Sequence, residues 1–268
     1  MFRDMTLGRY YPSDSVLHRL DPRVKLFGTV AFAVSLFFPR SMAGLLAATI
    51  FLGTVIGLSR VPVRLYIQGI RPLLVIIIFS ALMNMVFTPG EILFRFGPVT
   101  ITREGLFLAA FLVIRLLYLI VGSTVMTFTT TPCQLTAGLE KSLAFLSVFH
   151  IPVHEFAMMM SIALRFIPIL TEEMDKIMKA QMSRGADFEK GNLIIRAKKL
   201  IPVLLPLFVA ALRRASDLAM AMEARCYHGG KGRTRLYPLV YGKADFFAYA
   251  VLLIYLIIMA VTAFVIRV

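Results

Sequence analysis

Long apolar runs without an acidic residue constrain this chain more than any other feature of its sequence. Such runs cover residues 26–58, 72–88, 105–129 and 246–266. A helix that crosses the apolar core of a bilayer needs about 20 residues of this kind. In the whole chain 59% of residues are hydrophobic and 16% are charged, against about 45–50% and 25% in soluble domains. The sequence therefore predicts an all-α integral membrane protein.

About five membrane-spanning helices are expected, because the break Pro39-Arg40-Ser41 divides the first run. The expected spans are 26–38, 42–58, 72–88, 105–129 and 246–266. No signal-peptide pattern precedes them, so we place the N-terminus in the cytoplasm. The segment 59–71 carries three arginines and 89–104 carries two, which favours 59–71 inside and 89–104 outside. TPGE at 88–91 begins the outer loop and is compatible with a small hairpin.

The segment before the last expected span has a different character. Residues 171–243 contain fourteen Lys or Arg and seven Asp or Glu, so half of the net charge of +14 lies there. The apolar stretch LIPVLLPLFVAAL (200–212) is too short to favour a span, and polar residues flank it at helical spacing. We expect a long amphipathic helix along the membrane surface, kinked or locally opened by Pro202 and Pro206.

Residues 153–184 follow the same pattern. Their first half is apolar, and their second half reads TEEMDKIMKAQMSR. A further helix is expected at 134–149, separated from this one by Pro152. The predicted organisation is an N-terminal transmembrane part (1–131), a cytoplasmic-face part of amphipathic coupling helices (132–243) and a C-terminal transmembrane helix (244–268). The protein is expected to be a multi-pass protein of the cell (plasma) membrane.

Several kinds of chemistry are not supported by the sequence. HGGKGR (228–233) lacks the spacing of a phosphate-binding loop, and Pro152 prevents His150 and His154 from sharing a helix that could hold a metal. No Asp or Glu lies in the expected spans, which argues against a proton-coupled carrier. We therefore expect no catalytic residue, no metal and no cofactor.

The remaining charges and thiols have simple interpretations. The basic residues cluster between apolar spans, so contact with a lipid bilayer explains them and nucleic acid is not needed. Cys133 and Cys226 are too few for a disulfide framework. Arg115 is the charge deep in a span, and either a partner or backbone carbonyls could satisfy it, although an anion is an alternative ligand.

One short pattern occurs twice, in AQMSRG (180–185) and AMEARC (221–226). Each copy places an arginine between small residues at the end of an amphipathic helix: Ser183-Arg184-Gly185 and Ala224-Arg225-Cys226. A helix dipole favours arginine there by about 0.3–1 kcal/mol, which explains one copy better than two. Small flanks let the guanidinium enter a groove on a partner and pair with a carboxylate or with carbonyls. Two copies suggest two equivalent receptors, as in a dimer of motor domains.

These features together resemble a known family, the transmembrane T component of energy-coupling factor transporters, which import vitamins and transition-metal ions. The resemblance covers almost the whole chain. It shows at YYPSDSVLHRLDPRVK (10–25), LRFIPIL (164–170), AQMSRG (180–185), LIPVLLPL (200–207) and 213–225. The family's usual triplet is Ala-Arg-Gly, so Ser183 and Cys226 depart from it while keeping the flanks small.

The resemblance implies an energy-coupling subunit that is not itself an enzyme. Its partners would be two cytoplasmic ABC ATPase subunits, each docked on one of Arg184 and Arg225, and a small membrane-embedded subunit that binds the substrate. Closure of the ATPases would move the coupling helices and reorient that subunit. The sequence does not identify the imported nutrient.

Two further possibilities come from the cytoplasmic-face segment. Met174, Met178 and Met182 share one helix face and could offer an adaptable surface to the substrate-binding subunit, with packing inside the protein as the alternative. The alternative function is a lipid-modifying membrane enzyme with a basic cytoplasmic face. Such an enzyme would need a nucleophile, metal ligands or an acid pair, whereas the acidic cluster at 172–175 fits a solvated helix face.

Overall fold

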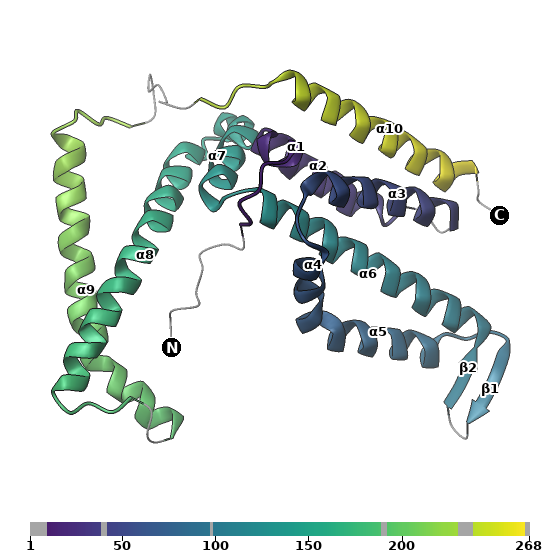
Figure 1. The fold of residues 1–268 in the computed structure, drawn as a ribbon, viewed down its shortest axis with the longest axis horizontal. Coiled ribbons are helices and arrows are strands. Elements are labelled where there is room, and N and C mark those ends of the chain that lie inside the picture. The colour runs from purple at the N-terminus through teal and green to yellow at the C-terminus, as the bar shows by residue number, and fades with distance from the viewer. Residues whose placement is uncertain (1–9, 39–41, 97–98, 189–191, 230–237, 266–268) are drawn as a thin grey trace. The chain divides into compact units, whose positions relative to one another are not determined.

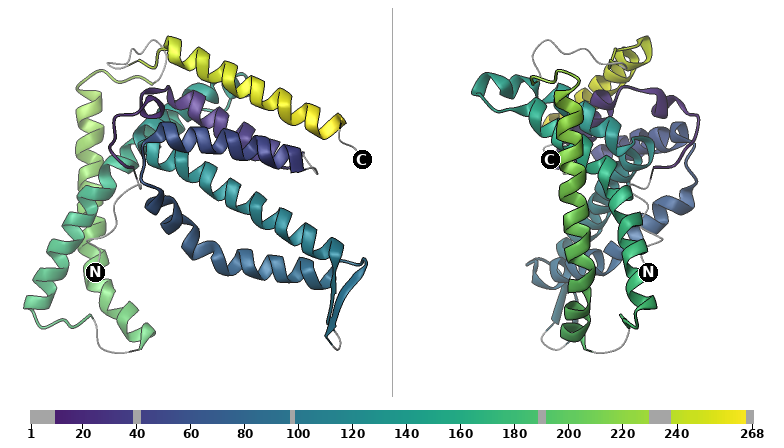
Figure 2. Two further views of the ribbon diagram at one scale, coloured as in Figure 1. Left: turned by 45° about the vertical axis from the view of Figure 1, so that its right-hand side comes forward. Right: turned by 90° about the vertical axis from the view of Figure 1, so that its left-hand side faces the viewer.

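The computed structural model describes residues 10–38, 42–96, 99–188, 192–229 and 238–265, and Figures 1 and 2 show its ribbon. The elements in chain order are α1 (Val16–Arg19), α2 (Pro22–Ser35), α3 (Met42–Ser59), α4 (Val63–Ile70), the 3-10 helix η1 (Arg71–Leu73), α5 (Leu74–Phe87), β1 (Ile92–Phe96), β2 (Val99–Thr102), α6 (Arg103–Thr129), α7 (Pro132–Ser142), the 3-10 helix η2 (Ala144–Phe149), α8 (Val153–Ser183), α9 (Leu193–Glu223) and α10 (Lys243–Val265). The chain is therefore essentially all-α, as predicted.

The chain divides into two compact units, which we describe separately. The bundle unit consists of Gly8–Gly138 and Leu239–Val268. The α8–α9 unit contains Leu139–Pro238.

Helices α2, α3, α6 and α10 pack together in the bundle unit (Figure 1). Their contact faces bury one apolar cluster, made of Phe32, Leu36, Ala48, Leu52, Leu252, Tyr255 and Met259. The rings of Phe51 and Tyr255 stack with their centroids 4.2 Å apart and join α3 to α10. Many large apolar side chains, such as Ile50, Phe79 and Phe264, point outward and are exposed. An apolar exterior of this kind is what a lipid-facing bundle requires.

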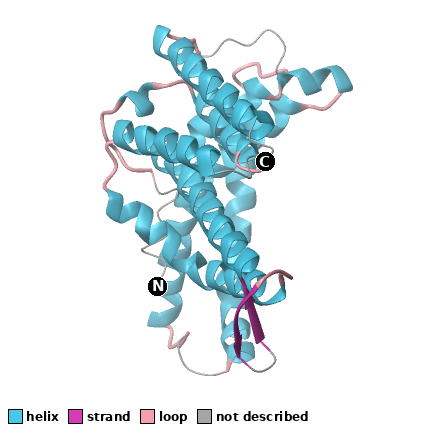
Figure 3. Cartoon of the chain, turned by 90° about the vertical axis from the view of Figure 1, so that its right-hand side faces the viewer, coloured by secondary structure: helices cyan, strands magenta, loops and turns pink. Residues whose placement is uncertain are grey.

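A small antiparallel hairpin, β1–β2, connects α5 to α6 and is drawn in magenta in Figure 3. The hairpin that TPGE at 88–91 allowed is therefore present. At the end of β2, the hydroxyl of Thr102 accepts a hydrogen bond of 3.1 Å from the backbone N–H of Gly105. This N-cap satisfies one of the free donors at the start of α6.

The predicted number of five membrane-spanning helices is confirmed, but one of the five is a different helix from the one expected. Among the described residues, five helices are long and apolar enough to cross a membrane: Met42–Ser59, Val63–Phe87, Arg103–Thr129, Val153–Ser183 and Lys243–Phe264. The expected span 26–38 is not among them, because α2 begins at Pro22 and has only 14 residues. In contrast, α8 has the length and composition to cross, although the sequence indicated a surface helix.

A buried polar cluster joins the starts of α2 and α10 in the bundle unit. The carboxylate of Asp245 accepts hydrogen bonds of 2.8 Å from the backbone N–H groups of Asp21 and Gly242. Arg23 forms an ion pair of 2.9 Å with Asp21 and lies 3.9 Å from the ring centroid of Tyr241. Burial acts to raise the pKa of Asp21, but the hydrogen bonds and charge of Arg23 outweigh it and hold that pKa below its usual value. The cluster fixes the last helix to the N-terminal segment.

Helices α8 and α9 contact each other and run in opposite directions in their unit (Figures 1 and 2). An ion pair of 3.4 Å between Glu173 and Arg214 joins them. Both helices have 31 residues, and α9 continues through Pro202 and Pro206 as one helix. The helix predicted at 134–149 was wrong in its second half, because α7 ends at Ser142 and the 3-10 helix η2 follows.

Candidate functional site

The first small-Arg-small copy ends α8 in a defined backbone geometry. Gly185 has a positive φ of 89°. Its N–H donates to the carbonyl of Met182 at 3.0 Å, and the N–H of Ala186 donates to the carbonyl of Gln181, also at 3.0 Å. This pair of bonds is a Schellman motif, in which a left-handed residue ends the helix and satisfies its last carbonyls. Arg184 occupies the position just before the left-handed residue.

The second copy ends α9 in the same way. Cys226 has a positive φ of 55°. Its N–H donates to the carbonyl of Glu223 at 2.8 Å, and the N–H of Tyr227 donates to the carbonyl of Met222 at 3.0 Å. Arg225 therefore holds the position in this Schellman motif that Arg184 holds in the first. The repetition seen in the sequence is a repetition of backbone shape.

The third residue of each triplet has a conformational role. Left-handed backbone is free of steric cost for glycine, whereas it costs an L-residue with a side chain roughly 1–2 kcal/mol. Gly185 fits this need, and Cys226 adopts the same conformation although it is not glycine. The departure at Cys226 therefore changes the side chain but keeps the backbone turn.

The side chains of both motif arginines, Arg184 and Arg225, are exposed to solvent. The side chains of Ser183, Arg184, Ala224 and Arg225 are exposed, as is Cys226. Within the part of the chain that the structure describes, neither guanidinium forms an ion pair. With small neighbours on both sides, each planar head is free to enter a groove and form two parallel hydrogen bonds.

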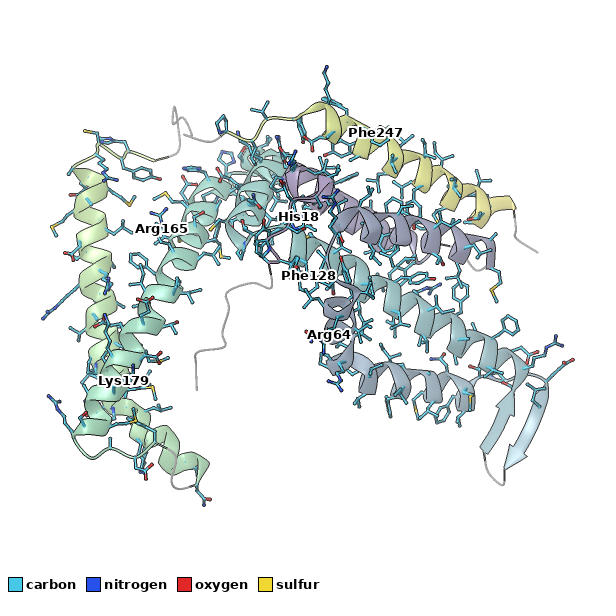
Figure 4. All side chains as sticks on the ribbon, viewed as in Figure 1. His18, Arg64, Phe128, Arg165, Lys179 and Phe247 are labelled. Atoms are coloured by element: carbon cyan, nitrogen blue, oxygen red, sulfur yellow. The ribbon has the colours of Figure 1, made fainter. Side chains whose placement is uncertain are left out.

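The C-terminal ends of α8 and α9 lie at opposite ends of the helix pair, as Figures 1 and 2 agree. Lys179, labelled in Figure 4, marks the part of α8 that leads into the first motif. A helix of 31 residues, such as α9, is roughly 45 Å long at a rise of about 1.5 Å per residue. The two arginines are thus presented at two separate places on one unit.

The three methionines that share one face of α8, Met174, Met178 and Met182, are only partly exposed. Met174 and Met178 are half-buried, and Met182 is 50% exposed. A larger apolar surface lies on α9, where the exposed side chains are Ile201, Leu204, Leu205, Phe208 and Leu212. Sequence reasoning did not single out these residues, although they belong to the apolar run 200–212 that it identified.

The other candidates do not form a site. His150 has a left-handed φ of 60° and precedes α8, while His154 pairs with Glu140 at 3.0 Å. Among the described residues, no group of three or more His, Cys, Asp or Glu could hold a metal. Residues 230–233 of HGGKGR lie outside the described residues. The guanidinium of Arg115 lies 5.0 Å from the ring centroid of Phe111 and 5.5 Å from that of Phe37, so two aromatic rings lie close to this charge.

Comparison with known proteins covers nearly the whole chain. Residues 13–236 match the CbiQ family, described as cobalt transport protein. An energy-coupling factor transporter transmembrane protein of Acidaminococcus fermentans is 48% identical over 262 residues, which is 97% of each chain. Proteins of the same name from Thermosediminibacter oceani and Bacillus subtilis are 49% and 42% identical. The alignment with the Thermosediminibacter oceani protein covers 92% of this chain and 93% of that protein. The alignment with the Bacillus subtilis protein covers the whole of both chains.

The family resolves the choice between the two functions that the sequence left open. The relatives are named as transmembrane components of a transporter, so the lipid-modifying enzyme was the wrong alternative. Together with five helices that can cross a membrane, the similarity makes this a multi-pass transport protein without catalytic activity of its own. The chain belongs to the family of energy-coupling factor transporter transmembrane proteins, the T components of these importers.

Proposed function

We propose that Arg184 and Arg225 are the two points at which this subunit holds its ATPases. The observation that carries the proposal is the repeated backbone geometry. Two exposed arginines occupy the same position of two Schellman motifs, and those motifs end different helices of one unit. One surface element presented twice fits two copies of one kind of receptor, which is what a pair of cytoplasmic ABC ATPase subunits provides.

The chemistry of docking follows from the helix ends. A Schellman turn satisfies the last carbonyls of its helix, so the arginine is not needed to cap them. Its guanidinium has five N–H donors in a planar fork and no stable neutral form, and it can pair with a carboxylate or cap carbonyls in a groove of the ATPase. Ser183 and Gly185, and likewise Ala224 and Cys226, add little bulk that could keep the fork out.

Helices α8 and α9 would then transmit motion. When ATP binding brings two ATPases together, each pulls on one motif and therefore on one helix. The Glu173–Arg214 pair joins α8 to α9, so a force on one helix end reaches the other helix. We propose that this movement reorients a separate small membrane subunit that captures a vitamin or a transition-metal ion. The exposed Met182 and the half-buried Met174 and Met178 would contribute to the surface that contacts that subunit.

The decisive experiment is copurification of the ATPases with a tagged Arg184→Ala/Arg225→Ala double variant. We expect the ATPases to be lost while expression and thermal stability stay at the wild-type level. The matched control is Arg213→Ala, because Arg213 is an exposed arginine of α9 outside both motifs. If the double variant retains its ATPases as well as the wild type does, the motifs are only helix ends and the proposal is wrong.

A further inference from the structure

The segment between α7 and α8 exposes a dense group of apolar side chains. In η2, Phe145 is 63% exposed, Val148 77% and Phe149 72%. Leu143 before them and Ile151 after them are also exposed. Such a concentration of apolar surface marks a contact with lipid or with another protein.

Several polar groups of the same segment form hydrogen bonds within it. The N–H of Leu146 donates to the carbonyl of Leu143 at 2.9 Å, and the N–H of His150 donates to that of Ser147 at 3.1 Å. The hydroxyl of Ser147 donates to the carbonyl of Ala144 at 2.6 Å. A segment that enters lipid must have its hydrogen bonds internally, because the apolar region offers no water. The segment can therefore leave water without breaking these bonds.

Charge and continuity favour lipid as the partner. Lys141 is exposed and stands just before the apolar group, and the neighbouring Glu140 pairs with His154 at 3.0 Å. A basic residue beside exposed aromatics is the composition that binds anionic head groups while apolar side chains enter the acyl boundary. The apolar surface continues into the first turns of α8 with exposed Phe156, Met159 and Met160.

We propose that residues 143–151 are an interfacial anchor of the α8–α9 unit. Phe145, Val148 and Phe149 insert at the boundary between head groups and acyl chains, and Lys141 pairs with lipid phosphates. A groove on another subunit could bind the same apolar side chains, and the experiment below distinguishes it from lipid. The anchor is independent of the docking role of Arg184 and Arg225.

Tryptophan fluorescence tests the anchor directly, because the chain contains no Trp. The full-length Phe149→Trp variant is reconstituted in nanodiscs of phosphatidylcholine and phosphatidylglycerol that carry bromine at a shallow or a deep acyl position. We expect loss of emission with shallow bromines, a smaller loss with deep bromines, and little quenching by iodide in the buffer. Phe79→Trp, in α5, is the control for a deep site, and His228→Trp, after α9, is the control for an aqueous site.

Two results would overturn the proposal. The first is Phe149→Trp emission that iodide quenches as strongly as that of His228→Trp, with no effect of brominated lipid. The second is quenching by brominated lipid that disappears when the substrate-binding subunit is added, which would make the segment a protein contact. Quenching by shallow bromines that persists in the complete transporter supports the anchor.

Discussion

Arginine has opposite surroundings in the two units of this molecule. In the bundle unit, Arg23 has 16% of its side chain exposed, pairs with Asp21 at 2.9 Å and lies over the ring of Tyr241. In the α8–α9 unit, Arg184 and Arg225 are exposed at helix ends, without an ion pair to any described residue. An arginine neutralised inside a fold holds that fold together, whereas one displayed between small residues is available to a partner. The difference predicts which property each substitution will change.

The largest effect on stability is expected for Arg23→Ala. This change leaves the carboxylate of Asp21 buried without its cation, and removing one partner of a buried ion pair costs about 3–5 kcal/mol. Thermal unfolding of the purified chain in detergent measures the loss. Arg19→Ala is the matched control, because Arg19 also pairs with an aspartate, Asp14, but both side chains are exposed. Equal melting temperatures for the two variants would contradict the structural role of Arg23.

The motif arginines should show the reverse behaviour when they are changed singly. Removing one side of an interfacial charge pair costs about 2–5 kcal/mol, so Arg184→Ala or Arg225→Ala should weaken ATPase binding by about thirty- to several-thousandfold. Lysine should restore little, since it has the charge without the planar fork. Titration of purified ATPases against each reconstituted variant measures this, with the melting temperature as the control for folding. A drop in stability without a drop in affinity would place these arginines in the same class as Arg23.

The left-handed residues of the two motifs allow a smaller, paired test. Gly185→Ala should destabilise the end of α8 by about 1–2 kcal/mol, because the new side chain must adopt a positive φ. Cys226→Gly should stabilise the end of α9, by about 0.5–1 kcal/mol, since glycine removes that cost but gains freedom in the unfolded chain. Hydrogen exchange at the last turn of each helix measures both. If both substitutions shift exchange in the same direction, the two turns are not equivalent.

The smallest effect is expected at the ion pair between α8 and α9. The side chains of Arg214 and Glu173 are 40% and 29% exposed. This pair is therefore less buried than Arg23–Asp21 and less exposed than Arg19–Asp14. Pairs near the surface contribute about 0–1 kcal/mol, so Glu173→Gln should lower the melting temperature slightly at low salt and less at high salt. Melting curves at two salt concentrations are the measurement. A loss as large as that of Arg23→Ala would show that the pair is fully shielded from solvent.

Much of the fold could be predicted from hydrophobic pattern because a bilayer constrains helices so strongly. The helices at Met42–Ser59, Leu74–Phe87, Arg103–Thr129 and Lys243–Val265 follow the apolar runs closely. The prediction was wrong at the start of α2 and after the end of α7, where the apolar pattern did not show where the α-helix begins or ends. Pro22 is favourable in the first turn of a helix, and the side chain of Asp21 caps it, so α2 begins before its apolar residues do. Between α7 and α8 the apolar run 143–149 did not reveal that a 3-10 helix replaces the α-helix.

The sequence by itself determined that this is a membrane protein with about five spans, that it lacks a phosphate-binding loop, and that one arginine motif occurs twice. These properties depend on composition and on neighbours along the chain. Only the tertiary structure decided that Cys226 repeats the turn of Gly185, that the two motifs lie at opposite ends of the α8–α9 pair, and that Asp245 bonds to the backbone of Asp21. The physical reason is that backbone handedness and contacts between distant residues arise from packing, which no local pattern specifies.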